Sequence, residues 1–259
     1  MSLRKSVPSF LLFFVLCGVP SSARANDEAI AANNHGYVLY KQNDLDGAIA
    51  SYSNAIELDP KFAMAYYNRG LAKREKGDLA GELADYDLAI ELDPKYEQAL
   101  YNRGIAREEK GDFDGSISDN SEIIKMDPKS AKAYYNRGIA RGQKGDLEGS
   151  IADNTQAITL DANYTQAYYN RGLARASKGD YKGAIEDNTQ VIALSPNNAE
   201  AYFNRGASYW KEKDYEKTVA DFEKAMALNP SYKAQAAPVI EQAKQFKAEA
   251  EQQKQETKG

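Results

Sequence analysis

Apolar and polar positions along this chain recur with two nested periods. At short range, apolar residues return after two helical turns, as Ile117 with Ile124 and Ile151 with Ile158, which is typical of one face of an α-helix. At long range the pattern repeats every 34 residues, because the hexapeptide AYYNRG at 65–70 returns in close copies at 99–104, 133–138, 167–172 and 201–206. A weaker copy, AANNHG, lies one step earlier at 31–36. The sequence therefore predicts six copies of one helical unit.

Each unit is predicted to be two helices joined by a tight turn. In the second unit the turn is 76–78, where Gly77 suits a left-handed helix end and Asp78 suits the N-cap of the next helix. A proline then ends the second helix, because it disfavours helical geometry in the residue before it. These closing prolines are Pro60, Pro94, Pro128, Pro196 and Pro230. Ala162 replaces the proline of the fourth unit, so we expect a looser turn there.

This pattern resembles the tetratricopeptide repeat (TPR) family. The features shared with it are the 34-residue period, the glycine of the first helix, a small residue in the second (Ala48, Ala184), alanines near its end and the closing proline. Glu82 departs from the pattern, because it lies where the second unit should carry its small residue. The units of this TPR domain, which spans 26–232, are 29–62, 63–96, 97–130, 131–164, 165–198 and 199–232.

The resemblance implies an all-α fold, a right-handed α-solenoid of six TPR helix-turn-helix units plus a C-terminal capping helix. One helix pair cannot bury its apolar face alone, so stacked pairs share a continuous core. The last unit then needs a cover, which the segment 233–259 supplies as a capping helix and a polar tail. The inner face of that helix is expected to carry Ala236, Val239, Ile240, Ala243 and Phe246, and the tail is expected to fray from Glu249 onward.

The first 25 residues have the three-part pattern of a secretory signal peptide. Arg4 and Lys5 form a basic start, an apolar run covers 10–19, and small residues at 23 and 25 predict cleavage after Ala25. The run is shorter than the roughly 20 residues that span a bilayer, although an uncleaved anchor remains an alternative. A lipid-modified Cys17 is a further alternative, which the large Leu16 disfavours. We therefore expect a secreted or periplasmic protein.

Charge and cysteine content narrow the classes of partner. Cleavage removes three of the 33 basic residues and none of the 38 acidic ones, so the net charge falls from −5 to −8. This charge argues against nucleic acid as a partner. Cleavage also removes Cys17, the single cysteine, and with it any disulfide or thiol chemistry. No later segment is apolar enough to cross a membrane, so no stable membrane insertion is expected.

An arginine precedes the glycine of the first helix, where TPR units usually carry a large apolar residue. These arginines, Arg69, Arg103, Arg137, Arg171 and Arg205, are matched by Asp85, Asp119, Asp153, Asp187 and Asp221 in the second helices. The first unit lacks both, having His35 and Ser51. Because a buried charge needs a partner, we predict that each arginine pairs with an aspartate of its own or the adjacent unit. The alternative is an anion-binding stripe of arginines.

An asparagine lies two residues before the glycine in every unit, and in TPR proteins this position looks into a concave groove lined by the first helices. Its amide can hold a peptide backbone at both N–H and C=O, which resembles the asparagine ladder of TPR domains that bind extended peptides. The preceding tyrosines would add contact area. The candidate peptide-binding residues are Asn34, Asn68, Asn102, Asn136, Asn170, Asn204, Tyr67, Tyr101, Tyr135 and Tyr169. The alternative is that the asparagines only brace neighbouring helices.

Catalysis and cofactor binding find no support in the sequence. His35 is the single histidine, and no nucleophile motif, phosphate loop, metal-ligand cluster or cofactor motif is present. The chaperone-tail clamp of some TPR proteins is also absent, since tyrosines replace most of its lysines and only Lys132 fits. We expect a non-catalytic extracytoplasmic scaffold that binds a partner peptide or protein surface. The alternative is a binding module for a cell-envelope glycan or lipid.

Overall fold

The computed structural model describes residues 27–256, so the predicted signal peptide at 1–25 lies outside the described residues. Within the described range every regular element is a helix and none is a strand. The first helices of the six units are α1 (Asp27–Lys41), α3 (Ala63–Glu75), α5 (Glu97–Glu109), α7 (Ala131–Lys144), α9 (Thr165–Ser177) and α11 (Ala199–Lys211). The second helices are α2 (Leu45–Leu58), α4 (Leu79–Leu92), α6 (Phe113–Met126), α8 (Leu147–Leu160), α10 (Tyr181–Leu194) and α12 (Tyr215–Leu228).

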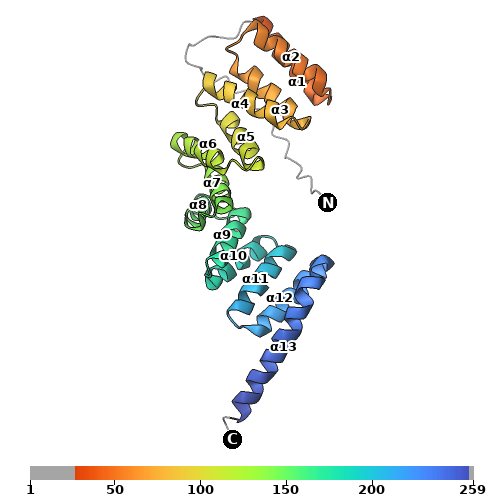
Figure 1. Ribbon diagram of the computed structural model, residues 1–259, viewed down its shortest axis with the longest axis vertical. Coiled ribbons are helices and arrows are strands. Elements are labelled where there is room, and N and C mark those ends of the chain that lie inside the picture. Colours follow the sequence, from red (N-terminus) through yellow and green to blue (C-terminus); the bar gives the residue numbers. More distant parts are fainter. Residues whose placement is uncertain (1–26, 257–259) are drawn as a thin grey trace.

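The helix pairs follow one another along the long axis of an elongated, curved molecule (Figure 1). Each helix packs against the helices before and after it in the chain, and some first helices also touch the next first helix, as α7 touches α9 and α9 touches α11. This is the all-α solenoid that the repeat predicted. No described helix combines the length and the apolar character needed to cross a membrane.

The turns between the helices follow the predicted chemistry. In each of the six units, the second helix has an aspartate as its N-cap residue. In the fourth unit, Asp146 Oδ1 accepts a hydrogen bond from the Gly149 N–H at 2.9 Å. Gly145 ends α7 with a φ of +90°, a left-handed geometry that favours glycine. The fourth unit, which lacks the closing proline, does not have the looser turn that we expected. Asp161 still accepts from the Asn163 N–H at 2.9 Å, as Asp127 does from Lys129 in the unit before.

Small residues let the two helices of a unit approach closely. Ala65, Ala72 and Ala89 are completely buried in the second unit. A Cβ atom on Gly70 would lie 2.7 Å from the ring of Tyr86, which is closer than atoms can pack. The core is therefore a continuous strip between successive helices, and each unit completes the burial of its neighbour.

The C-terminal end of the solenoid is covered as predicted. A short 3-10 helix (Pro230–Tyr232) leads into α13 (Lys233–Glu256), whose Ala236, Ile240 and Ala243 are buried. Phe246 remains 39% exposed, although its ring stacks on Trp210 with 5.8 Å between the centroids. Helix α13 continues to Glu256, so the polar segment expected to fray from Glu249 is helical as far as that residue. A side-chain hydrogen bond from Gln245 to Glu249, one turn apart, supports this polar extension.

Candidate functional site

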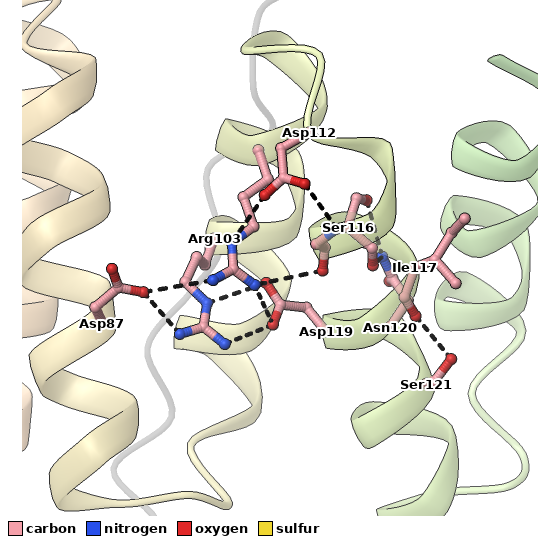
Figure 2. A network of polar contacts seen from close by, with 10 residues as sticks. Asp87, Arg103, Asp112, Ser116, Ile117, Asp119, Asn120 and Ser121 are labelled. Carbon is pink, nitrogen blue, oxygen red and sulfur yellow. Dashed lines mark hydrogen bonds and ion pairs between the residues drawn. The ribbon is translucent and has the colours of Figure 1, made fainter. Parts of the chain in front are cut away.

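A row of arginine–aspartate pairs runs through the interior of the solenoid. Arg103 donates from Nε and Nη2 to the two carboxylate oxygens of Asp119 at 3.0 and 2.5 Å, a bidentate geometry (Figure 2). Asp119 is 1% exposed, so the pair is shielded from water. The same pair forms within each of the five units from the second to the sixth: Arg69–Asp85, Arg103–Asp119, Arg137–Asp153, Arg171–Asp187 and Arg205–Asp221.

A second cation shares each of the first four aspartates. Arg107, one turn beyond Arg103, donates to Asp119 at 2.9 Å, and Arg141 donates to Asp153 at 2.7 Å. Burial raises the pKa of Asp119, and the two nearby arginines oppose that rise. The two like charges that repel on the first helix are thus drawn together by one buried carboxylate.

Each arginine of the row also reaches back to the preceding unit. The Nη1 atom of Arg137 donates to Ser121 Oγ at 3.1 Å, and that of Arg103 donates to Asp87 at 2.8 Å. One guanidinium therefore joins a first helix to the second helices on both sides of it. In the first unit His35 Nδ1 and Ser51 Oγ lie 3.0 Å apart and occupy the same two places.

This geometry decides between the two interpretations of the arginines. All five guanidinium groups are engaged by carboxylates of the protein itself, and all five are less than one-fifth exposed at the side chain. The predicted structural pairing is thus present, and the arginines do not form a stripe open to anions.

The asparagines predicted to bind a peptide lie between successive first helices. The amide nitrogen of Asn68 donates to Asn33 Oδ1 at 2.8 Å, and that of Asn102 donates to the Tyr67 hydroxyl at 3.0 Å. Asn204 donates to the Tyr169 hydroxyl at 3.3 Å. In these three the donor of the side chain braces the neighbouring unit, which leaves the carbonyl oxygen for other bonds.

Of the remaining asparagines, Asn170 follows the same pattern and Asn136 and Asn34 do not. Burial raises the pKa of Tyr135, and a hydrogen bond with Asn170 opposes the rise, so that pair is also joined across the junction. The amide nitrogen of Asn136 is buried and has no partner among the described residues. Asn34, in the first unit, is exposed.

The tyrosines of the candidate site are half-buried and pack partly against the chain. The Tyr67 ring lies 5.0 Å from that of Tyr96, and the Tyr135 ring lies 4.9 Å from that of Tyr164. The Lys132 ammonium lies 3.6 Å from the centre of the Tyr101 ring, a cation–π contact. The rings thus form a firm wall along the first helices, with one edge buried and the other exposed.

Two features escaped the sequence analysis. Glu82, which departs from the repeat, is 1% exposed and is held by Arg74 at 2.8 Å, and burial raises its pKa although Arg74 opposes the rise. Lysines at the ends of first helices pair with acids at the starts of preceding second helices, as Lys144 with Asp114 and Lys178 with Glu148, each at 2.5 Å. The sequence shows that these lysines recur every 34 residues, but it does not show that each one contacts an acid of the preceding unit.

Metal or acid–base chemistry has no obvious centre in the described part of the chain. No group of three or more histidine, cysteine, aspartate or glutamate side chains is arranged to hold a metal ion there. Most of the buried acids are paired with arginine. The polar side chains described above therefore serve mainly to hold neighbouring helices and units together.

A stack of such helix pairs, with an interior neutralised by its own ion pairs, defines an α-solenoid repeat protein. Family models agree: TPR repeat models match 36–77 and 172–213, and tetratricopeptide repeat models match 63–96, 101–165 and 199–232. The chain belongs to the tetratricopeptide repeat family. No curated protein matches it.

Several solved structures share the fold. MamA is 29% identical over 67% of this chain and 94% of its own, with a TM-score of 0.62. YrrB, described as a TPR protein with an unusual peptide-binding site, is 23% identical over 75% of this chain and 97% of its own, with a TM-score of 0.63. PilW, described as a widely conserved type IV pilus biogenesis factor, is 15% identical over 83% of this chain and all of its own, with a TM-score of 0.67. At the identities of YrrB and PilW the likeness concerns the fold alone.

Proposed function

We propose that this chain is a non-catalytic protein–protein interaction scaffold that works outside the cytoplasm. It binds a partner segment along the first-helix face, which we define as the surface formed by α1, α3, α5, α7, α9 and α11. The observation that carries this proposal is the regular row of half-buried tyrosines and braced asparagines along that face. Such a row supplies rigid aromatic contact area and fixed polar groups at little entropic cost.

The bracing bonds support a refined role for the asparagines. Because Asn102 and Asn204 use their amide nitrogens on a neighbouring tyrosine, their carbonyl oxygens are the groups left to accept from a backbone N–H. The predicted ladder then binds a peptide through acceptors on these two units. The glycan or lipid alternative loses its main support, since the arginines that would carry it are paired with aspartates.

Photo-crosslinking tests the binding face. A photoreactive amino acid replaces Met64, which is 48% exposed in the first turn of α3 and lies one turn before Tyr67. The matched control replaces Leu88, which is 38% exposed on the second helix α4. We expect a discrete crosslinked partner from the Met64 variant and none from the Leu88 variant. Equal crosslinking by the two variants contradicts the proposal.

The location has a separate test, since it rests on the residue pattern of 1–25. The N-terminus of the protein isolated from its own cells should be Asn26, as determined by mass spectrometry of the intact chain. An intact Met1 in a cytosolic fraction contradicts the extracytoplasmic location. A lipid adduct on Cys17 supports the anchored alternative instead.

A further inference from the structure

Helix α1, in the unit at one end of the elongated molecule, carries an exposed apolar surface (Figure 1). Its residues Ile30, Tyr37 and Val38 are 39%, 37% and 49% exposed. In the 34-residue register of Ile30, the third to sixth units carry polar or charged residues instead: Gln98, Lys132, Gln166 and Glu200. The terminal unit of a repeat array usually presents a polar outer face, so an apolar one indicates that another surface packs on it.

This surface is the counterpart of the face by which later units pack on the unit before them. Ala72 of α3 packs against Ala48 of α2, and Ala133 of α7 packs in the same way on α6. The α1 residues in these two registers are Val38 and Ala31, and both are exposed. The residue at 38 is also larger than its counterparts, which are Ala72, Ala106, Ala140, Ala174 and Ser208. Helix α1 thus presents a helix-packing face to solvent.

The exposed residues of this face lie on one line along α1. They follow one another at steps of three or four residues, the spacing of a seam between two helices that pack side by side: Asp27, Ile30, Asn34, Val38 and Lys41. The line is balanced about Asn34, because an aliphatic residue lies one turn away on each side of it. An acid stands in the first turn and a base in the last, so the two ends of the line have opposite charge.

We propose that a second copy of this chain packs on this surface, with the two α1 helices antiparallel and related by a two-fold axis at Asn34. Each copy then sets its Asp27 against Lys41 of the other and its Ile30 against Val38. The two Asn34 amides meet on the axis, where each has a donor and an acceptor for the other. A parallel pair would set acid against acid and base against base, so charge favours the antiparallel arrangement. A face that complements itself in this way is typical of a two-fold dimer.

The inference goes beyond the proposed function, because it needs no partner other than the chain itself. It assigns Asn34 to the interface between copies instead of to the partner segment. That assignment agrees with the later units, in which Asn68 and Asn102 donate to the unit before them. A dimer joined at α1 also carries two first-helix faces in one particle, so a partner with two segments would bind with avidity.

Sedimentation equilibrium tests the association on protein expressed from the full sequence and purified as the cell processes it. We expect a monomer–dimer equilibrium with a dissociation constant on the order of 0.1 mM, because one helix pair buries less than the roughly 1,200 Å² of a standard interface. Val38→Glu should weaken the dimer by at least about tenfold, since it buries a charge against Ile30. The matched control, Leu88→Glu, changes a residue that is 38% exposed on α4 and should leave the dimer unchanged.

Three results of this experiment would overturn the two-fold pairing. A monomer at all concentrations would leave the surface to a different protein. Assemblies that grow beyond a dimer would indicate head-to-tail stacking. Equal dimerisation of the native chain and the Val38→Glu variant, with the melting temperature retained, would place the interface elsewhere. None of these results affects the crosslinking test of the first-helix face.

Single cysteines test the direction and the register of the pairing. All variants carry Cys17→Ser, so the introduced cysteine is the only one in the chain. Asn34→Cys lies on the proposed axis, so two copies should form a disulfide under mild oxidation. Ile30→Cys lies one turn, about 6 Å, from the axis in each copy, so two such chains hold their cysteines about 12 Å apart, too far to bond.

A mixture of Ile30→Cys and Val38→Cys chains should form the mixed disulfide, because these positions face each other in the antiparallel pair. Non-reducing electrophoresis measures the rate of each crosslink. Ile30→Cys chains that crosslink with one another as fast as Asn34→Cys chains would overturn the antiparallel register.

Discussion

At the scale of single residues, the unusual feature is the placement of charge where TPR units are ordinarily apolar. Arg137 and Arg141 converge on Asp153, which is 3% exposed, so that one buried carboxylate serves two cations. Such a cluster is tolerated because both oxygens of the carboxylate accept from the arginines, and it becomes costly once a partner is removed.

The first prediction concerns Arg137→Leu. This change leaves Asp153 with Arg141 alone and leaves Ser121 without its guanidinium donor, so we expect a loss of about 3 kcal/mol in the free energy of unfolding. Urea denaturation measures the loss. Lys125→Leu, which removes a lysine from an exposed pair with Glu122, is the control and should change stability by about 0.5 kcal/mol or less. An unchanged midpoint for Arg137→Leu would remove the argument for a structural seam.

The second prediction concerns the pH dependence that Glu82 creates. Because burial raises the pKa of Glu82 in the folded chain, the unfolded chain releases this proton at lower pH. The stability contributed by Glu82 is thus full below the ordinary glutamate pKa and falls as pH rises through the folded value. Glu82→Gln mimics the protonated acid, so its stability relative to the native protein should rise from pH 4 to pH 7.

Urea denaturation at several pH values measures this difference. The exposed Glu122→Gln is the control, and its stability relative to the native protein should stay constant over the same range. A constant difference for Glu82→Gln as well would show that Glu82 ionises as readily in the folded chain as in the unfolded one.

At the scale of helices and turns, most of the fold could be read from the sequence. The hexapeptide repeat predicted the paired helices, and the aspartates before each second helix predicted its caps, because both depend on local chemistry. The arginine–aspartate pairing could be predicted because the first unit lacks both residues, with His35 in place of the arginine and Ser51 in place of the aspartate. The prediction of a looser turn at Ala162 was wrong, since the side chain of Asp161 holds that turn without proline.

The distances between helices of neighbouring units could not be predicted from the sequence. The bonds from Asn102 to Tyr67 and from Glu82 to Arg74 depend on how far one helix lies from the next. Packing sets those distances, and periodicity alone carries no information about them. The candidate peptide-binding residues therefore stay a prediction, with their bracing bonds as an added constraint.

The third prediction concerns the junction between the second and third units. Lys110 is the counterpart of Lys76, Lys144 and Lys178, but Ala80 stands where those three lysines find Asp46, Asp114 and Glu148. Ala80→Glu should restore the missing pair and stabilise the protein by about 0.5 kcal/mol at low ionic strength, with the gain screened at high salt. Thermal melting at two salt concentrations measures it. Ala84→Glu, one turn further along α4, should give no such gain.

At the scale of the whole molecule, stability is shared among units that cover one another, and the last unit depends on α13. Phe222, which is 3% exposed, packs with Ala236 and Ile240 of that helix. At the opposite end of the described residues, Val38 of α1 is 49% exposed. The two ends of the solenoid thus differ in how completely the core is closed.

The fourth prediction is that truncation after Tyr232 destabilises the sixth unit. Removal of α13 exposes Phe222 and its neighbours, so we expect a loss on the order of 3 kcal/mol and binding of a hydrophobic dye. Truncation after Ala248 keeps Phe246 and all the buried residues of α13, and should leave the melting temperature nearly unchanged. Equal melting of the two truncated chains would mean that α13 does not cover the core.

Each of these arginines bonds a side chain of the preceding repeat, and these bonds determine by how many residues the chain can be shortened or lengthened. Arg171 takes its hydroxyl partner from Thr155, and Arg137 takes the equivalent hydroxyl from Ser121. Excision of residues 131–164 as one block would set Arg171 opposite Ser121, a like-for-like exchange of hydroxyl groups. A cut whose length is not a multiple of 34 residues would break the succession of pairs, so the array is built to gain or lose whole repeats and nothing smaller.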